Sequence, residues 1–387
     1  MFTFYEFFAG GGMARAGLDT GWRCLFANDI DHKKTDSYAI NWGDDVLKVA
    51  DIRTLTSKDI PGIAHLAWAS FPCQDLSLAG GGAGLRGGRS GTFWPFWDIM
   101  RALISENRGP DMIVLENVCG TLTSHQGKDF AAICSTFERA GYRFGALVVD
   151  AAFFVPQSRP RVFMIGARAD LSLPADLLET KTDLGTPEEW RPRPLCTAFE
   201  RLSPKLKDNW VWWRLPLPHA SLSDLRFADI VEEKPTDVSW HTPFETQRLL
   251  EMMNPTHMEK VARAKKLGHP IVGAIYKRTR LDANGVKIQR AEIRFDEKAG
   301  CLRTPAGGSS RQLILVVDGD QVRSRLISSR ETARLMGLPD SYVLPNKYNE
   351  AYHLTGDGVV LPVVRHLAKH IFEPFLSVNK KIQMAAA

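Results

Sequence analysis

Short apolar runs alternate with segments of helical periodicity from the start of the chain to about residue 168. The runs with the length and composition of strands are 3–7, 23–28, 64–70, 112–116, 143–150 and 161–167. Strands that alternate with helices in this way are typical of a doubly wound sheet in which most strands are parallel. We therefore predict an α/β fold for this part of the chain.

The pattern changes after residue 169. Pro, Trp and acidic residues become frequent and the periodicity is weak up to about residue 240, and a basic, turn-rich stretch then continues to about residue 298. Such a shift marks a domain boundary. We predict a first domain over 1–169, a smaller irregular domain over 170–345, and a C-terminal segment, 346–387, that returns to the first domain.

Two later segments carry clear local signals. The apolar run 313–317 and the turn 318–320 predict one arm of a β-hairpin. Ser329 is expected to be the N-cap of a helix that ends at Gly337, because serine favours that position and glycine favours helix ends.

The composition is that of a soluble globular protein, since 44% of the 387 residues are hydrophobic and 24% are charged. No apolar stretch is long enough to cross a bilayer, and the N-terminus lacks the basic and apolar regions of a signal peptide. We expect a cytoplasmic protein without a membrane partner, and we expect it to be a monomer.

The cysteines and histidines do not form a metal-binding pattern. The six cysteines are scattered without a Cys-x-x-Cys pair, so we interpret them as reduced thiols rather than disulfides or zinc ligands. His366 and His370 have ligand spacing on one helix face but lack an acidic or cysteine partner. We therefore expect no metal.

A glycine-rich segment follows the first predicted strand. Gly10, Gly11 and Gly12 lie between that strand and a helix, where backbone N–H groups can approach an adenosyl ligand. Asp29 follows about twenty residues later at the end of the next strand, where its carboxylate suits a ribose hydroxyl. Asp51-Ile52 comes later at a spacing that fits the end of a third, neighbouring strand. The Gly-Lys-Ser/Thr of a phosphate loop is missing, which disfavours ATP. NAD and S-adenosylmethionine remain as the candidate cofactors.

The segment Phe71-Pro72-Cys73-Gln74 comes directly after the apolar run 64–70 and before the glycine-rich segment 80–91. A cysteine at the end of a strand, next to a flexible loop, is placed like a nucleophile. Most intracellular cysteines are instead buried structural thiols. Both interpretations of Cys73 remain open from the local pattern alone.

Charged residues occur at two further strand ends. The apolar run 112–118 includes Glu116 near its end, which belongs at the same sheet edge as Cys73. Arg159 and Arg161 alternate just before the next strand, so they project to one side of an extended chain. The alternatives are a helix cap for the glutamate and ordinary salt bridges for the arginines.

In their order, these motifs closely resemble those of the bacterial DNA (cytosine-5)-methyltransferases. The matching segments are 8–12, 71–74, 116–118 and 157–161, and later 303–305, 329–340 and 356–359. The resemblance spans residues 2 to about 375. It implies a Rossmann-like class I methyltransferase domain and a smaller target-recognition domain.

The resemblance also implies the reaction. The enzyme would transfer a methyl group from S-adenosylmethionine to C5 of a flipped-out cytosine in double-stranded DNA, with S-adenosylhomocysteine as product. Cys73 would form a covalent bond to cytosine C6, because C5 is otherwise a poor nucleophile. Glu116 would act as an acid at N3, Arg161 would contact O2, and Arg159 would support Cys73 or the base electrostatically.

The family's cofactor residues carry over to twelve positions of this sequence. They are Phe8, Ala9, Gly10, Gly12, Asp29, Ile30, Asp51, Ile52, Pro72, Phe93, Asp357 and Gly358. Asp29 would hold the ribose, and the isoleucines would cover the adenine. Two residues depart from the family pattern, because Glu6 replaces the usual Asp and Asp357 the usual Asn, which puts the contact of Asp357 with the methionine part in doubt.

DNA contacts are expected in two regions. The expected contact residues are Gln74, Ser77, Arg86 and Arg89 near the glycine-rich loop, and Lys277, Arg278, Arg280 and Arg290 in the variable region. The loop would close over the DNA. Residues 256–298 hold eleven Lys or Arg against five Asp or Glu, within a net charge of +5. Trp210, Trp212 and Trp213 either join these contacts or belong to the core.

Three alternatives to this function remain. A relative of the same fold methylates cytosine in transfer RNA, and another class of relative binds DNA without catalysis. A cysteine-dependent amidotransferase or phosphatase would need a histidine partner or a Cys-x5-Arg loop, whereas the sixth residue after Cys73 is Ala79. As a DNA methyltransferase, the protein would serve restriction-modification or phage defence, with a cognate restriction or defence protein as a partner.

Overall fold

The structure is a computed structural model that describes residues 1–72, 85, 90–179, 189–219, 225–281, 285–304 and 311–386. Five residues with predicted roles lie outside these ranges, namely Cys73, Gln74, Ser77, Arg86 and Arg89. The expected closing loop is also outside the described residues, apart from Leu85 and the residues from 90 onward.

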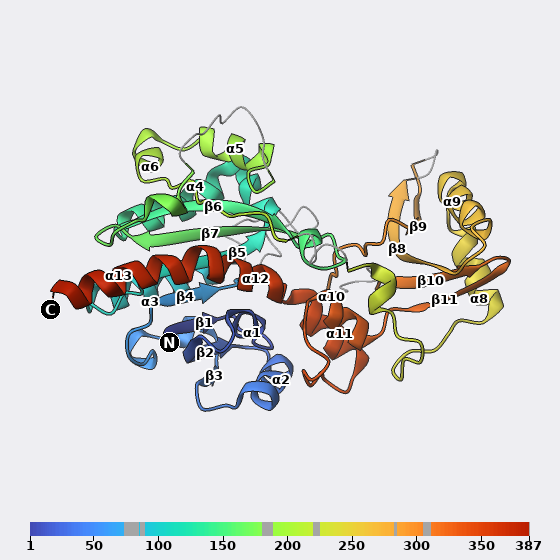
Figure 1. Ribbon diagram of the computed structural model, residues 1–387, viewed down its shortest axis with the longest axis horizontal. Coiled ribbons are helices and arrows are strands. Elements are labelled where there is room, and N and C mark those ends of the chain that lie inside the picture. Colours follow the sequence, from blue (N-terminus) through green and yellow to red (C-terminus); the bar gives the residue numbers. More distant parts are fainter. Residues whose placement is uncertain are drawn as a thin grey trace. The chain divides into compact units, whose positions relative to one another are not determined.

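The chain forms two compact units that are interleaved in sequence (Figure 1). The first unit comprises Met1–Asp150, Pro160–Leu217 and Leu361–Ala387, and the second comprises Ala151–Arg159 and Pro218–Val360. The division into domains at residues 169 and 345 remains a prediction.

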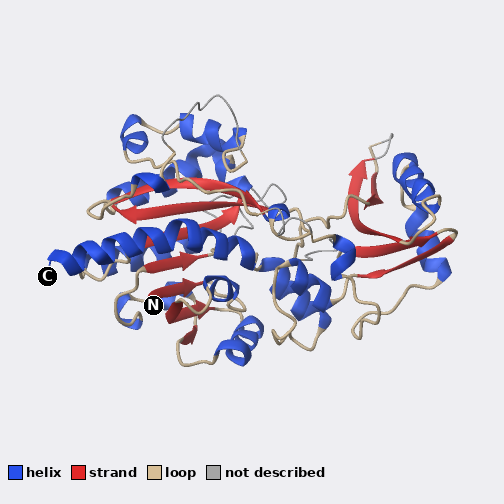
Figure 2. Ribbon diagram, viewed as in Figure 1, coloured by secondary structure: helices blue, strands red, loops and turns tan. Residues whose placement is uncertain are grey.

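The first unit is built on a 7-stranded sheet with the order β3-β2-β1-β4-β5-β7-β6 (Figure 2). The strands are β1 (Phe2–Phe7), β2 (Trp22–Asp29), β3 (Leu47–Val49), β4 (Leu66–Ala69), β5 (Met112–Val118), β6 (Tyr142–Asp150) and β7 (Pro160–Arg168). The neighbours from β3 to β5 are parallel, and β7 is antiparallel to both β5 and β6. The predicted α/β fold with a mostly parallel sheet is therefore confirmed.

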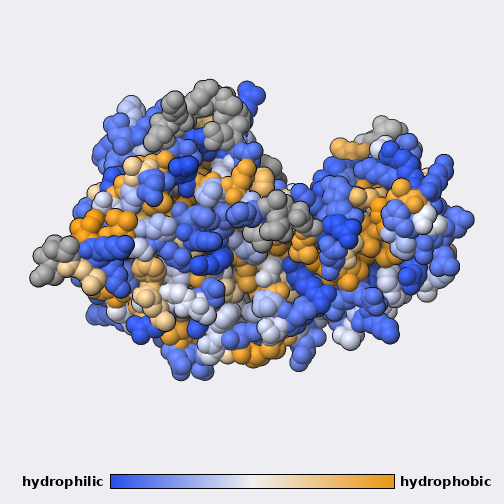
Figure 3. Space-filling model, in the orientation of Figure 1, coloured by the Kyte–Doolittle hydropathy of each residue, from blue (hydrophilic) through white to orange (hydrophobic). Residues whose placement is uncertain are grey.

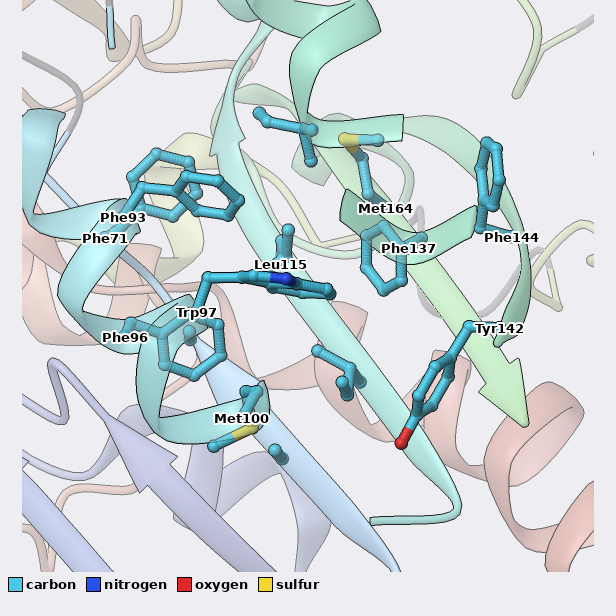
Figure 4. Packing of buried hydrophobic residues seen from close by; sticks show 14 of the residues in the cluster. Phe71, Phe93, Phe96, Trp97, Met100, Leu115, Phe137, Tyr142, Phe144 and Met164 are labelled. Carbon is cyan, nitrogen blue, oxygen red and sulfur yellow. The ribbon is translucent and has the colours of Figure 1, made fainter. Parts of the chain in front are cut away.

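Helices pack on both faces of this sheet. They are α1 (Met13–Leu18), α2 (His32–Trp42), α3 (Phe93–Ser105), α4 (Lys128–Arg139), α5 (Arg193–Glu200), α6 (Pro204–Asp208), α12 (Leu361–Leu367) and α13 (Glu373–Ala386), with a π-helical segment at Ala368–Phe372. Helices α3 and α4 contribute Trp97 and Phe137 to the core that covers Leu115 of β5 (Figure 4). On the other face, Glu373 of α13 accepts a hydrogen bond from Trp22 Nε1 at 3.0 Å.

Trp210, Trp212 and Trp213 belong to the first unit, and their contacts agree with the interpretation as core. Trp213 is 1% exposed, and its indole N–H donates to the Ile165 carbonyl at 3.1 Å. Trp210 and Trp212 pack against Phe199, with ring centroids 5.2 and 4.9 Å from it. The structure thus gives these side chains a packing role.

The second unit contains a 4-stranded antiparallel sheet with the order β11-β10-β8-β9. Its strands are β8 (Ile271–Leu281), β9 (Lys287–Arg294), β10 (Leu313–Asp318) and β11 (Gln321–Leu326), and its helices are α8 (Pro243–Glu251), α9 (Pro255–Lys265), α10 (Ser329–Leu335) and α11 (Tyr348–Asp357). The predicted hairpin at 313–320 is confirmed by β10 and β11. The stretch that we described as basic and turn-rich contains α9, β8 and β9, so it is more regular than expected.

The predicted N-cap of helix α10 is wrong by one residue. Ser328, not Ser329, caps the helix, because its hydroxyl accepts the Glu331 N–H at 3.1 Å while the Glu331 carboxylate accepts the Ser328 N–H at 2.7 Å. This reciprocal capping box requires a spacing of three residues, which selects Ser328 from the two adjacent serines.

Hydrophilic residues cover much of the face seen in Figure 3, and apolar residues are interspersed among them. Within the described ranges, no helix has the length and apolar character needed to traverse a bilayer.

Candidate functional site

The carboxyl ends of four parallel strands meet at one edge of the sheet in the first unit. Phe7 of β1 pairs with Asn28 of β2 and with Ala69 of β4, and Ala69 pairs in turn with Leu115 of β5. The residues that follow in each strand are therefore neighbours along this edge, which is where open α/β sheets bind their ligands. Phe8 and Glu116 directly follow two of these paired residues, and Cys73 follows Ala69 four positions later.

The glycine-rich turn at this edge has a constrained backbone. Phe8, Gly10 and Gly12 have φ values of 57°, 55° and 77°. A Cβ atom on Gly12 would lie 2.5 Å from Trp42 Nε1, so only glycine fits there. The same indole N–H donates to the Gly11 carbonyl at 3.1 Å. Trp42, which our sequence analysis did not identify, therefore fixes the path of this turn.

Asp29 connects the glycine-rich turn to the end of β2. Its Oδ2 atom accepts the Gly10 N–H at 2.8 Å, and its Oδ1 atom accepts the Asp31 N–H at 2.9 Å. Each carboxylate oxygen has a second lone pair, which leaves capacity for two hydroxyl donors of a ribose. Ile30, next to Asp29 in the sequence, is 60% exposed. An exposed apolar side chain of this kind can pack against a flat ligand. Asp29 and Ile30 therefore fit an adenosyl group.

The other residues expected at the adenine differ in exposure. Asp51 uses its carboxylate to accept the Arg53 N–H at 2.9 Å and a guanidinium N–H of Arg53 at 3.1 Å. Ile52 is 4% exposed. Phe93 is completely buried against Phe71, with ring centroids 5.3 Å apart (Figure 4). Pro72 is half-buried. The cofactor roles of these four residues remain predictions.

Glu6 is a buried acid directly behind the glycine-rich turn. It is 1% exposed, and its Oε1 atom accepts the Arg15 N–H at 3.2 Å. Its Oε2 atom has no hydrogen-bond partner among the described residues. Burial is the main cause that raises the pKa of Glu6 to about 8, and the Arg15 N–H opposes this effect. Burial therefore favours the protonated form of Glu6 at neutral pH.

This burial predicts a pH-dependent stability. The pKa of Glu6 rises from an ordinary 4.5 to about 8 on folding, so between these pH values the folded protein binds the proton and the unfolded chain does not. The contribution of protonated Glu6 to the free energy of unfolding is complete below about pH 4.5 and is lost as the pH rises through about 8. We expect Glu6→Gln to remove this part of the pH dependence in urea unfolding measured from pH 5 to pH 9. If the free energy of unfolding changed with pH in the same way for the variant and the wild type, the raised pKa of Glu6 would be contradicted.

Glu116 and Arg161 form an ion pair at the same sheet edge. Arg161 Nε lies 3.2 Å from Glu116 Oε1, and both side chains are largely buried, with 15% and 8% exposed. The pairing of β5 with antiparallel β7 places Arg161 opposite Val118, which brings the two charges together. A carboxyl and a guanidinium held side by side can contact adjacent polar atoms of one flat heterocycle.

Asn117 links β5 to the segment that precedes Cys73. Its side-chain N–H donates to the Phe71 carbonyl at 3.1 Å, and its Oδ1 atom accepts the Val118 N–H at 2.9 Å. Our sequence analysis gave Asn117 no role, although its place next to Glu116 was the available signal. The described contacts identify it as a positioning residue for the 71–72 segment.

Seven predicted site residues belong to the second unit, namely Arg159, Asp357, Gly358 and four predicted DNA-binding residues. The Arg159 guanidinium donates to the carbonyls of Leu302, Gly356 and Gly358 at 2.8, 2.9 and 2.7 Å. Asp357 accepts a hydrogen bond from the Thr304 hydroxyl. Arg159 thus stabilises the chain around Gly358, and its electrostatic effect on Cys73 or the base remains a prediction. The predicted DNA-binding residues Lys277, Arg278, Arg280 and Arg290 lie on β8 and β9.

A mostly parallel sheet with these groups at its carboxyl edge is the architecture of a Rossmann-like methyltransferase. Solved structures share the fold. S. pombe Dnmt2 methyltransferase aligns with a TM-score of 0.56 and 18% identity, and covers 97% of this chain and 99% of its own. The methyltransferase EhMeth of Entamoeba histolytica aligns with a TM-score of 0.60 and 14% identity, over 97% and 98% of the two chains.

The sequence comparisons define the family. The family model for C-5 cytosine-specific DNA methylases matches residues 2–373, and the chain belongs to this family. The Type II methyltransferase M.HhaI of Haemophilus parahaemolyticus is 28% identical over 380 residues, which cover 96% of each chain. The DNA-cytosine methyltransferase of Escherichia coli (strain K12) is 27% identical over 424 residues, which cover 100% of this chain and 79% of the relative. The expected enzyme class, a DNA (cytosine-5-)-methyltransferase, is thus confirmed.

Proposed function

We propose that the protein transfers a methyl group from S-adenosylmethionine to C5 of a flipped-out cytosine in double-stranded DNA, through a covalent bond between Cys73 and C6. The observation that carries this proposal is the strand register at one sheet edge. It aligns the end of β4, four residues before Cys73, with the Glu116–Arg161 pair and with the glycine-rich turn. The nucleophile, the acid and the cofactor are thus expected within reach of one base.

In this proposal the thiolate of Cys73 donates an electron pair to C6, and the S–C6 bond forms while Glu116 gives a proton to N3. Arg161 donates to O2 and opposes the charge that develops on the ring. When bound, S-adenosylmethionine supplies the methyl group as an electrophilic carbon. C5 bonds to this carbon, with S-adenosylhomocysteine as the leaving group. A base from solvent then takes the C5 proton, and the electron pair of the C5–H bond forms the C5=C6 double bond while the S–C6 bond breaks to release the thiolate of Cys73. N3 finally returns its proton to Glu116.

The cofactor would lie along the ends of β1, β2 and β3. Phe8, Ala9, Gly10 and Gly12 would face its methionine part and backbone, and Asp29 its ribose. The adenine would lie near Ile30, Asp51, Ile52 and Phe93, and Pro72, Asp357 and Gly358 are further expected cofactor contacts. The support for this proposal is the spare acceptor capacity of Asp29 and the exposed apolar side chain of Ile30.

The DNA steps of the proposal depend on the segment after Cys73. A cytosine in a duplex is inaccessible to a thiolate, so the base must leave the helix. Gln74 would contact the DNA, Ser77 would approach the vacated position, and Arg86 and Arg89 would meet phosphates as the loop closes. We infer a role in restriction-modification or phage defence, in the cytoplasm, for a monomer that works beside a cognate defence protein.

The proposal predicts that Cys73→Ser abolishes methylation of duplex DNA, because a hydroxyl is a far weaker nucleophile at neutral pH. Bisulfite sequencing of DNA from cells that express the wild-type or the Cys73→Ser protein measures the methylation. Cys196→Ser is the matched control, since its sulfur donates to the Arg191 carbonyl at 3.4 Å and a hydroxyl can make the same bond. Wild-type protein should also form a covalent adduct with duplex DNA that contains 5-fluorocytosine, which cannot lose its C5 substituent.

Two outcomes would contradict the proposal. Cytosine methylation that persists in Cys73→Ser would exclude the covalent step. Methylation of transfer RNA by wild-type protein, without methylation of duplex DNA, would instead favour the RNA substrate.

A further inference from the structure

Strands β8 and β9 continue beyond the sheet of the second unit as a two-stranded ribbon, defined by residues 276–281 and 287–292 (Figure 1). Strand β10 pairs with β8 only over Ile271–Ile275, whereas β9 stays paired with it up to Leu281. The apolar core of this unit includes Ile275 and Ala291, and the side chains from Arg278 to Leu281 are exposed. A two-stranded ribbon is marginally stable by itself, so packing does not explain its length.

One face of the ribbon concentrates arginines. Side chains alternate between the faces of a strand, so Arg278 and Arg280 share a face, and the register places Arg290 directly opposite Arg278. Like charges that face each other across an antiparallel pair are destabilising. The facing arginines therefore do not stabilise the protein by itself, but they are suited to bind an anionic or hydrogen-bond-accepting ligand.

A single carboxylate orients part of this face. Arg280 donates to Glu292 Oε1 through Nε at 2.8 Å and Nη2 at 2.5 Å, and Arg278 Nε lies 3.6 Å from Glu292 Oε2. The Arg278 guanidinium also lies 4.6 Å from the centre of the Tyr276 ring. Arg290 makes no side-chain hydrogen bond or ion pair within the described parts of the chain. The guanidinium groups of Arg278 and Arg280 thus share one carboxylate, and Arg290 lies on the same face without a counter-charge among the described residues.

The shape and chemistry of this face match one ligand. The major groove of DNA admits a two-stranded β-ribbon, and the commonest specific contact there is a bidentate bond from arginine to O6 and N7 of guanine. An arginine held by a carboxylate and a ring presents its donors in a defined direction, which base recognition needs and phosphate contact does not.

We propose that Arg278 and Arg290 read guanines of the recognition sequence in the major groove, and that Glu292 is a positioning residue for Arg278. This inference rests on the proposed DNA methylation. It adds that the recognition sequence contains guanines whose selection depends on the ribbon.

The test uses full-length protein and a library of DNA duplexes with randomised bases around cytosine, read by bisulfite sequencing. Arg290→Gln and Arg278→Gln should each relax the requirement for guanine at one position by about 5- to 150-fold, the discrimination of one bidentate contact. Glu292→Gln should weaken the preference that depends on Arg278 without a change in Tm. Arg263→Gln, on α9 of the same unit, should keep the wild-type preference.

Three results would overturn the inference. The first is that the DNA sequence methylated by wild-type protein contains no required guanine. The second is that the arginine variants lose methylation uniformly and keep the wild-type base preference. The third is that these variants methylate the same sequences as wild-type protein. The uniform loss would indicate phosphate contacts. If wild-type protein methylates no duplex at all, the proposed function itself fails, so the two failures are distinguishable.

Discussion

Glu116→Gln is expected to lower kcat for cytosine methylation about 10²- to 10⁴-fold, the usual contribution of a positioned general acid. Glutamine has nearly the same shape, and its carbonyl oxygen can still accept from Arg161 Nε, which lies 3.2 Å from the native carboxylate. It cannot give a proton to N3. The loss should therefore appear in kcat, measured by single-turnover transfer of a labelled methyl group, with little change in the KM for DNA.

Asp111→Asn is the matched control for this variant. Asp111 directly precedes Met112 at the opposite end of β5, so the control removes a carboxylate from the same strand but not from the carboxyl edge. We expect its kcat to stay near the wild-type value. A Glu116→Gln protein with wild-type kcat, or an equal loss in both variants, would exclude Glu116 as the acid.

The sheet of the first unit was largely predictable from the sequence because its central strands are buried on both faces. Such strands are continuous apolar runs, and the predicted 112–116 corresponds to the observed Met112–Val118. The prediction stopped at Glu116 because the next residue, Asn117, is also polar and interrupts the apolar run. The edge strand Leu47–Val49 was not among the predicted strands, although Asp51-Ile52 was expected at a strand end, because it is three residues long and two of them are exposed.

The second unit was less predictable for a related reason. The ribbon of β8 and β9 carries charged and polar side chains on both faces beyond Ile275, so it lacks the apolar alternation that indicates a strand. Its pairing depends on contacts between residues far apart in the sequence. The basic composition was visible, but the opposition of Arg278 and Arg290 required the register.

The candidate site shows the same division between local and long-range information. The residue types at the strand ends indicated Glu116 and Asp29, because parallel strands bring their carboxyl ends to one edge. The hydrogen bond from Asn117 to the Phe71 carbonyl and the burial of Glu6 were not visible in the sequence. Both arise from packing between segments that the local pattern does not connect.

The buried ion pair between Arg325 and Glu331 is the other feature for which we expect a large effect. Both side chains are fully buried, and they form two hydrogen bonds of 2.8 and 2.5 Å. Glu331 also accepts the backbone N–H groups of Glu232 and Ser328, each at 2.7 Å. The carboxylate therefore joins β11, the start of α10 and the segment near residue 232. Its removal would leave a buried guanidinium without its counter-charge.

We expect Glu331→Ala to lower the free energy of unfolding by about 3–5 kcal/mol, the range for breaking a buried pair. Urea unfolding monitored by circular dichroism measures this difference. Lys347→Ala breaks the exposed pair with Glu350, whose charged atoms lie 3.5 Å apart, and should cost less than about 1 kcal/mol. The double variant Arg325→Met/Glu331→Leu should be more stable than Glu331→Ala, because it leaves no unpaired buried charge. Equal losses in Glu331→Ala and Lys347→Ala would show that burial adds nothing to the pair.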